Sequence, residues 1–93
     1  MDNNFELYTE ETELLKILAH PVRICIVRGL MDKDNCNVNT MQACLELPQP
    51  TVSRHLQLLK GAGIIKGTRK GNEIFYTLSN DKIQKVIQVL FED

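Results

Sequence analysis

A run of hydrogen-bonding side chains just past the middle of the chain has the chemistry to recognise bases. Arg54 can donate two hydrogen bonds to the O6 and N7 atoms of guanine, and the amide of Gln57 can pair with adenine. Ser53 lies beside Arg54, and Gln49 and Thr51 stand about one turn earlier. Counted from Ser53, Arg54 follows after one position and Gln57 after four. Side chains of these types at this spacing predict contacts with base edges in a groove of double-stranded DNA.

Such side chains need a helix to present them, and apolar residues of the same segment define its buried side. Val52, Leu56 and Leu59 follow one another at i, i+4 and i+7, which is the spacing of a stripe along a helix. Ser53, Arg54 and Gln57 fall on the opposite side of that helix, and Gln49 and Thr51 sit at its N-terminus. Pro50 suits its first turn, where the free N–H groups favour a phosphate. The segment therefore predicts a helix that enters the major groove by its N-terminal end.

The charges of the chain are unevenly distributed, although the net charge is only −1. Residues 1–47 carry four basic and eight acidic side chains, whereas residues 48–78 carry five basic ones against a single acid. The basic side chains of this second segment include Lys60 on the expected helix, and Arg69 and Lys70 beyond it. A contiguous basic block can contact the phosphates of nucleic acid, and it can equally be a solvated surface.

The rest of the sequence predicts the elements that hold this helix in place. Thr9 can cap a first helix, and Asn39 with Gln42 has the spacing of a capping box for a short third one. We expect one domain, 1–93, that is mainly α with a small β-hairpin, a winged helix-turn-helix of order α-α-α-α-β-β-α. Periodicity and turn residues place its elements at about 9–19, 21–31, 39–45, 50–60, 64–68 with 73–78, and 81–91.

Two stretches of the chain carry a family resemblance. The first is ELLKILAHPVRICIV, and the second is LELPQPTVSRHLQLLKGAGIIKGTRKGNEIFYTL. Together they resemble the ArsR/SmtB family of bacterial winged-helix repressors over roughly residues 10–90. The resemblance implies a dimeric repressor whose first and last helices form the subunit interface, and which an effector releases from its operator. It also implies that DNA is read by the residues at Gln49, Pro50, Thr51, Ser53 and Arg54.

Many members of that family sense metals, and their metal ligands do not recur here at the matching positions. The resemblance places one family site, a Cys-x-Cys pair, on Asn37 and Asn39, with Cys36 one residue too early. The other family site uses Asp and His of the last helix, where this sequence has no histidine. A zinc site needs about four Cys, His or carboxylate ligands, so we expect neither a metal nor a cofactor.

Three cysteines, an odd number, argue against a disulfide framework. Cys25 lies in the most apolar helix and Cys44 on the inner side of the third, where a free cysteine acts as a small apolar residue. Cys36 precedes a helix N-terminus, where a thiolate is favoured. Cys36 and Cys44 are therefore the candidates for a thiol or redox response, and the effector stays unidentified.

Both histidines have a structural interpretation. His20 precedes Pro21 and is expected to cap the second helix. His55 lies at the edge of the buried stripe, where it either packs beneath the DNA-facing side or bonds a phosphate.

The helices at the two ends of the chain carry more apolar surface than so short a monomer can cover. Pairing across a two-fold axis would bury the excess, so we expect a homodimer. A two-fold dimer predicts an operator that is an imperfect inverted repeat. The residues expected at the dimer interface are Leu14, Leu15, Leu18, Ile83, Val86, Ile87 and Leu90.

Other classes of protein fit the sequence less well. It has no nucleophile–base pair and no glycine-rich phosphate loop, so we expect no enzyme. No stretch is long enough to span a membrane and the N-terminus lacks the features of a signal peptide, which predicts a cytoplasmic protein. The alternative function is a winged-helix module that binds a protein through the same surface. Leu58 favours that alternative, whereas the basic block and Arg54 favour DNA.

Overall fold

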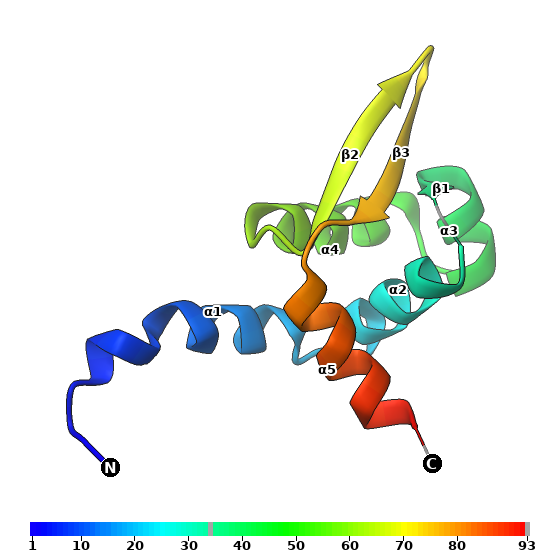
Figure 1. Ribbon diagram of the computed structural model, residues 1–93. Coiled ribbons are helices and arrows are strands. Elements are labelled where there is room, and N and C mark those ends of the chain that lie inside the picture. Colours follow the sequence, from blue (N-terminus) through cyan, green and yellow to red (C-terminus); the bar gives the residue numbers. More distant parts are fainter. Residues whose placement is uncertain (34, 93) are drawn as a thin grey trace.

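Figure 1 shows the arrangement of the helices and strands. Most of the helices begin at a side-chain cap or carry a proline in the first turn, where one fewer N–H group is left free. In the computed structural model, which describes residues 1–33 and 35–92, His20 Nδ1 accepts a hydrogen bond from the N–H of Val22 at 3.1 Å. This confirms the predicted cap of the second helix. In chain order the elements are η1 (Phe5–Tyr8), α1 (Thr9–Leu18), α2 (Pro21–Asp32), β1 (Cys36–Asn37), α3 (Val38–Leu45), α4 (Gln49–Gly61), β2 (Ile65–Lys70), β3 (Glu73–Leu78) and α5 (Asp81–Phe91).

The prediction of a mainly α fold with a β-hairpin is confirmed, with two differences at helix ends. The cap of α3 is Asn37 rather than Asn39, because the Oδ1 atom of Asn37 accepts from the N–H of Thr40 at 2.8 Å. Helix α1 follows the 3-10 turn η1 directly, so Tyr8 occupies the cap position that was expected for Thr9. Both differences place the cap before the expected residue and leave the order of the helices unchanged.

The sheet contains one strand that the sequence did not predict. Its order is β1–β3–β2 and all pairings are antiparallel, with Cys36–Asn37 forming the short strand beside β3. In the hairpin, Gly67 stands opposite Tyr76. A Cβ atom at Gly67 would lie 3.0 Å from Cγ2 of Ile74 and 3.2 Å from Cε1 of Tyr76. Only glycine lets the core tyrosine lie this close to β2.

The core lies where α2, α4 and α5 meet the inner ends of the hairpin strands. Full burial of an aliphatic side chain contributes about 1.5–3 kcal/mol, so this cluster fixes how the helices pack. The buried apolar residues are Leu18, Ile26, Val27, Leu30, Met41, Val52, Leu56, Leu59, Ile64, Ile65, Tyr76, Ile83 and Ile87.

Two parts of the molecule project from this core. Figure 1 shows α1 extending away from the body towards the N-terminus, while the hairpin of β2 and β3 rises beside α4. The molecule is accordingly elongated, with principal extents of 49 × 30 × 22 Å. Large apolar side chains on η1, α1 and α5 stay exposed, and they include Phe5, Leu7, Leu15, Val86, Val89, Leu90 and Phe91.

Candidate nucleic-acid interface

Helices α3 and α4 are joined by a tight turn. Glu46 ends α3 in the left-handed conformation (φ 55°, ψ 41°), and its N–H donates to the carbonyl oxygen of Gln42 at 2.9 Å. The carbonyl oxygen of Pro48 then accepts from Thr51 and Val52 at 3.0 and 3.1 Å, so α4 begins at once. The two helices form a helix-turn-helix, and α4 is its second helix.

The two sides of α4 differ as its sequence predicts. Val52, Leu56 and Leu59 are buried in the core, while Arg54 and Gln57 are exposed on the outer side. The remaining predicted contacts lie on the same element: Gln49, Pro50 and Lys60 are exposed, and Thr51 and Ser53 are half-buried. Helix α4 therefore brings seven of the nine predicted DNA contacts onto one rigid element.

His55 ties α4 to the start of α2, and it is the one buried polar side chain among the residues that the structure describes. Its Nδ1 atom lies 3.2 Å from Nη1 of Arg23, and its ring centroid lies 4.6 Å from that of His20. Burial lowers the pKa of His55, and the neighbouring His20, Arg23 and Arg54 lower this pKa further. Arg23 also donates through Nε to the carbonyl oxygen of Ile17 in α1. The burial of His55 favours packing beneath the outer side of α4 over contact with a phosphate.

The hairpin carries the other two predicted contacts at its tip. Strand β2 runs to Lys70, and the two-residue turn contains Gly71 at φ 64°. A positive φ at the first central position is typical of a type II′ turn, which favours glycine there. Arg69 donates through Nε to the carbonyl oxygen of Gly71 at 3.3 Å, and the Nζ atom of Lys70 lies 5.7 Å from the ring centroid of Phe75. Both cations are exposed, so this wing presents them beyond α4.

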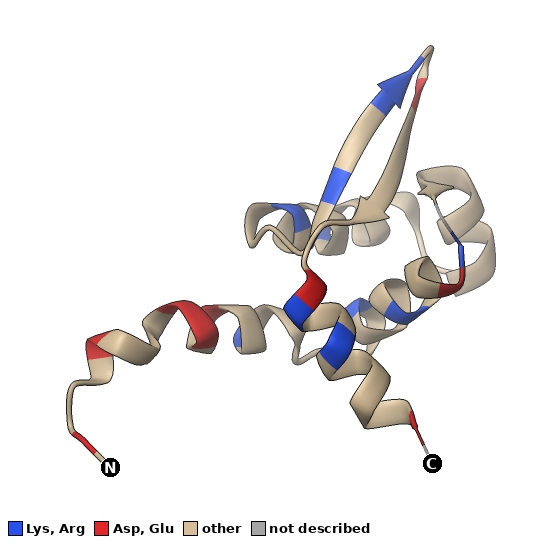
Figure 2. Ribbon diagram, viewed as in Figure 1, with Lys and Arg blue, Asp and Glu red and all other residues tan. Residues whose placement is uncertain are grey.

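The distribution of charge over the fold separates two ends of the molecule. Figure 2 shows basic residues on α4 and along β2, and acidic residues along α1. The acid of the basic block, Glu73, accepts a hydrogen bond from Nδ2 of Asn37 at 3.1 Å. Lys66 is a further exposed cation on β2. It was not among the predicted site residues, although alternation along β2 places it on the same side as Thr68.

The structure corrects two expectations about the cysteines. The sequence predicted that Cys25 and Cys44 would pack as small apolar residues inside the protein, but both side chains are exposed. Cys36 is half-buried, and burial raises the pKa of its thiol, which is opposite to the expected preference for a thiolate. Desolvation disfavours the charged form more than the nearby Lys33 favours it.

Only some of the residues predicted at the dimer interface are exposed in the structure. Leu18, Ile83 and Ile87 are buried in the chain's own core, so they are not available to a partner in this arrangement. Leu15, Val86 and Leu90 are exposed, and Leu14 is half-buried against the core. The first three, together with exposed apolar residues that the sequence did not single out, such as Phe5 and Val89, form an apolar end of the molecule.

Residues 1–33 and 35–92 contain neither a cluster of metal ligands nor a helix that could span a membrane. Within these ranges, no group of three His, Cys, Asp or Glu side chains is arranged to hold a metal ion. None of the helices in the same ranges combines the length and the hydropathy that a membrane span requires.

A helix-turn-helix followed by a basic hairpin defines the class: the chain is a winged helix-turn-helix protein. Residues 18–68 match the family model of a helix-turn-helix domain. The sequence is 40% identical over 82 residues to the HTH-type transcriptional repressor SmtB of Mycobacterium tuberculosis, which covers 88% of this chain. The chain belongs to the ArsR/SmtB family of winged-helix transcriptional repressors.

A second relative agrees with this assignment, and a further solved structure shares the fold. The transcriptional repressor PagR of Bacillus anthracis is 41% identical over 81 residues, covering 87% of this chain and 81% of PagR. Its crystal structure matches with a TM-score of 0.83 at 38% identity, over 94% of this chain and 99% of that one. The solution structure of the homodimeric winged helix-turn-helix domain of Mb0332 from Mycobacterium bovis shares the fold, with a TM-score of 0.82 at 21% identity over 97% of this chain and 82% of that domain.

The relatives also bear on the class of function. This chain spans 60% of the length of SmtB. SmtB and PagR are transcriptional repressors and not enzymes, in agreement with the prediction for this sequence.

Proposed function

We propose that this chain is a homodimeric repressor that binds operator DNA by placing α4 of each protomer in the major groove. The observation that carries the proposal is the outer side of α4, where Arg54 and Gln57 are exposed on a helix whose other side is packed in the core. The similarity to SmtB and PagR, both transcriptional repressors, supports the same activity here. We expect a repressor of this kind to act in the cytoplasm.

The exposed residues divide into two roles. Arg54 reads guanine through a bidentate pair, since the N-terminal half of a recognition helix meets base edges, and Gln57, which lies about one turn further along α4, reads a neighbouring base. The cations further out, Lys60, Arg69 and Lys70, contact phosphates and supply affinity for any sequence. The half-buried Thr51 and Ser53 support the same contacts near the start of the helix.

The dimer forms through the apolar end of the molecule. Exposed leucine, valine and phenylalanine side chains on η1, α1 and α5 would stay in water in a monomer. A pair of protomers related by a two-fold axis covers them and presents two copies of α4 to an inverted repeat. The homodimeric state of the Mb0332 domain supports this arrangement.

The same surface is less suited to a protein partner. A protein interface has an apolar centre, and α4 offers Leu58 as its large exposed apolar side chain. Exposed arginine, glutamine and lysine surround it on this helix. The composition of the surface favours DNA over the alternative of a protein-binding module.

Selection of bound DNA tests the proposal. The pure protein is mixed with genomic fragments, and the retained fragments are sequenced. We expect an imperfect inverted repeat whose half-site centres lie about one helical turn, or a multiple of it, apart. A gel shift with one such fragment should weaken steeply as salt rises, whereas a scrambled fragment of equal length should bind less tightly at every salt concentration. Retention without a shared repeat would contradict the proposal.

A further inference from the structure

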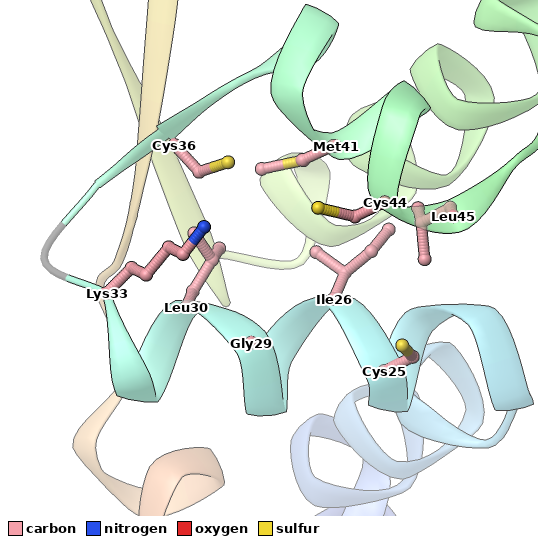
Figure 3. A pocket seen from close by; sticks show the side chains of 9 residues that line it. All are labelled: Cys25, Ile26, Gly29, Leu30, Lys33, Cys36, Met41, Cys44 and Leu45. Carbon is pink, nitrogen blue, oxygen red and sulfur yellow. The ribbon is translucent and has the colours of Figure 1, made fainter.

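A cavity between α2 and α3 brings all three cysteines of the chain to one place (Figure 3). It has a volume of about 170 Å³, which suits a small molecule rather than a segment of chain. Apart from the cysteines and Lys33, its walls are apolar, with side chains such as Ile26, Leu30 and Met41. The sequence places these cysteines in three different elements, so only the fold shows that they share a cavity.

The side chains at the cavity point towards a common space. In Figure 3 the sulfur of Cys36, on β1, and that of Cys44, on α3, point towards each other across the end of Met41. The ammonium group of Lys33 extends into the same region from the end of α2, and Cys25 stands at the opposite end of the cavity. The site therefore combines two thiols and one cation over an apolar floor.

The two facing thiols differ in their surroundings. Cys36 is half-buried, its Sγ atom donates to the carbonyl oxygen of Asn37 at 3.6 Å, and burial raises the pKa of its thiol. Cys44 is exposed at the mouth of the cavity. A nucleophilic thiol must be reachable, and the exposed Cys44 meets this condition better than the half-buried Cys36.

We propose that this cavity receives a small apolar electrophile with an α,β-unsaturated carbonyl group, and that Cys44 adds to it. The sulfur forms a bond to the β-carbon, the π pair of the carbon–carbon double bond shifts to the bond between the α-carbon and the carbonyl carbon, and the π pair of the carbonyl group moves to its oxygen. Lys33 stabilises that oxygen, and the proton released by the thiol ends on the α-carbon through water. No oxidant is required, whereas a disulfide between Cys36 and Cys44 would need one.

The position of the cavity connects a molecule bound there to α4, the helix that we propose reads DNA. One wall is α2, which carries the core, and the other is α3, which leads into α4 through the turn at 46–48. An adduct wedged between α2 and α3 would move α3, and α4 would move with it relative to the groove. The role of the adduct as an effector rests on the repressor function proposed above, whereas its formation does not.

The test uses the intact protein with 2-cyclohexen-1-one as the electrophile and mass spectrometry to locate the adduct. We expect Cys44 to react at least about tenfold faster than Cys25, because Cys25 stands at the opposite end of the cavity from Lys33. Cyclohexanone, which has nearly the same shape but no activated double bond, should slow modification of Cys44 more than that of Cys25, which stands at the opposite end of the cavity. Equal rates at all three cysteines, or no protection by cyclohexanone, would overturn the proposal, as would a disulfide in place of an adduct.

Variants that fill the cavity give an independent readout. A Cβ atom at Gly29, which lines the cavity, would meet nothing within 4 Å, so a larger side chain has room there. Gly29→Leu should abolish the protection by cyclohexanone, whereas the matched Gly29→Ala should retain it. If Gly29→Leu fails to fold, the rates and the protection measured on the wild-type protein still decide the question.

Operator affinity separates this proposal from the repressor function. Modified wild-type protein should bind the selected operator about five- to 150-fold more weakly, while Cys44→Ser should be insensitive to the enone. If the unmodified protein binds no operator, the proposed function fails although the adduct can still form. If it binds the operator and the Cys44 adduct leaves the affinity unchanged, the effector role is overturned.

Discussion

The two ends of this molecule expose opposite kinds of surface. Around α4 and the wing, most exposed side chains are basic or polar, with Leu58 and Ile74 as the large apolar exceptions, and α4 is fixed by buried residues on its other side (Figure 2). Around α1 and α5, large apolar side chains are exposed beside charged ones, which are mainly acidic on α1 and include Lys82 and Lys85 on α5. The same small core therefore supports two different surfaces. The surface around α4 and the wing suits a charged partner in water, whereas the apolar side chains around α1 and α5 are stabilised when a partner covers them.

The difference teaches how function can be distributed over so short a chain. A surface for phosphates and base edges works while hydrated, so it costs the monomer little. An apolar end is unfavourable until a second copy covers it, so the assembly contributes stability that the small core does not. Changes at the two ends should accordingly have different signatures.

The largest effect is expected at the apolar end. Leu90→Asp places a charge where the proposed dimer buries an aliphatic side chain, and burial of an unpaired charge is strongly unfavourable. Sedimentation should show a monomer at micromolar concentration. Operator affinity should fall by about a thousandfold or more, because specific binding needs both copies of α4.

The matched control for that variant adds an acid elsewhere on the same helix. Lys82 is exposed in the first turn of α5, where an aspartate suits the helix dipole. Lys82→Asp should remain dimeric and should bind the operator nearly as well as the wild type. If Leu90→Asp is also dimeric, the apolar end is not the subunit interface.

A smaller effect is expected at the wing. Arg69→Ala combined with Lys70→Ala should weaken binding to operator and to scrambled DNA by the same factor. The slope of log affinity against log salt should become shallower by about 0.9 for each phosphate that the protein no longer neutralises. Titrations at several salt concentrations measure this slope, and Lys16→Ala on α1 is the control that should leave it unchanged. A decrease in operator binding alone would show that the wing reads sequence.

The smallest effect is expected at the junction beneath α4. The folded state lowers the pKa of His55 below its ordinary value of 6.5, so the unfolded chain binds this proton more readily. This contribution to the free energy of unfolding is present above pH 6.5 and is lost as the pH falls towards the folded-state pKa. Chemical denaturation of the wild type and of His55→Gln at several pH values measures it. A slope below pH 6.5 that persists unchanged in His55→Gln would contradict the assignment.

The sequence predicted helix α4 and its two sides well because the signal is local. Val52, Leu56 and Leu59 share one side of a single helix, so their burial and the exposure of Arg54 follow from helical periodicity alone. The hairpin was also predictable from its turn residues. Even the missed Lys66 lies on a strand whose alternation places it outside.

The burial of the cysteines and of the predicted dimer residues could not be predicted from the local sequence. Apolar neighbours suggested that Cys25 is buried, but its side of α2 faces the cavity rather than the core. On α5, Ile87 and Leu90 belong to one predicted stripe, yet the first is buried and the second is 61% exposed. Which part of an apolar stripe is covered depends on how far the neighbouring helices extend, and helical spacing does not contain that information.

The measurement that tests the reading role of α4 most directly is the ratio of operator to scrambled-DNA affinity for Arg54→Ala. The Arg54 side chain is exposed, and its removal leaves the buried side of α4 unchanged. Removing a bidentate contact to guanine should cost about 1–3 kcal/mol per half-site, so operator affinity should fall while affinity for scrambled DNA falls far less. Lys16→Ala should keep the wild-type ratio. An Arg54→Ala protein that keeps the full ratio would contradict the assignment of α4 as the helix that reads DNA.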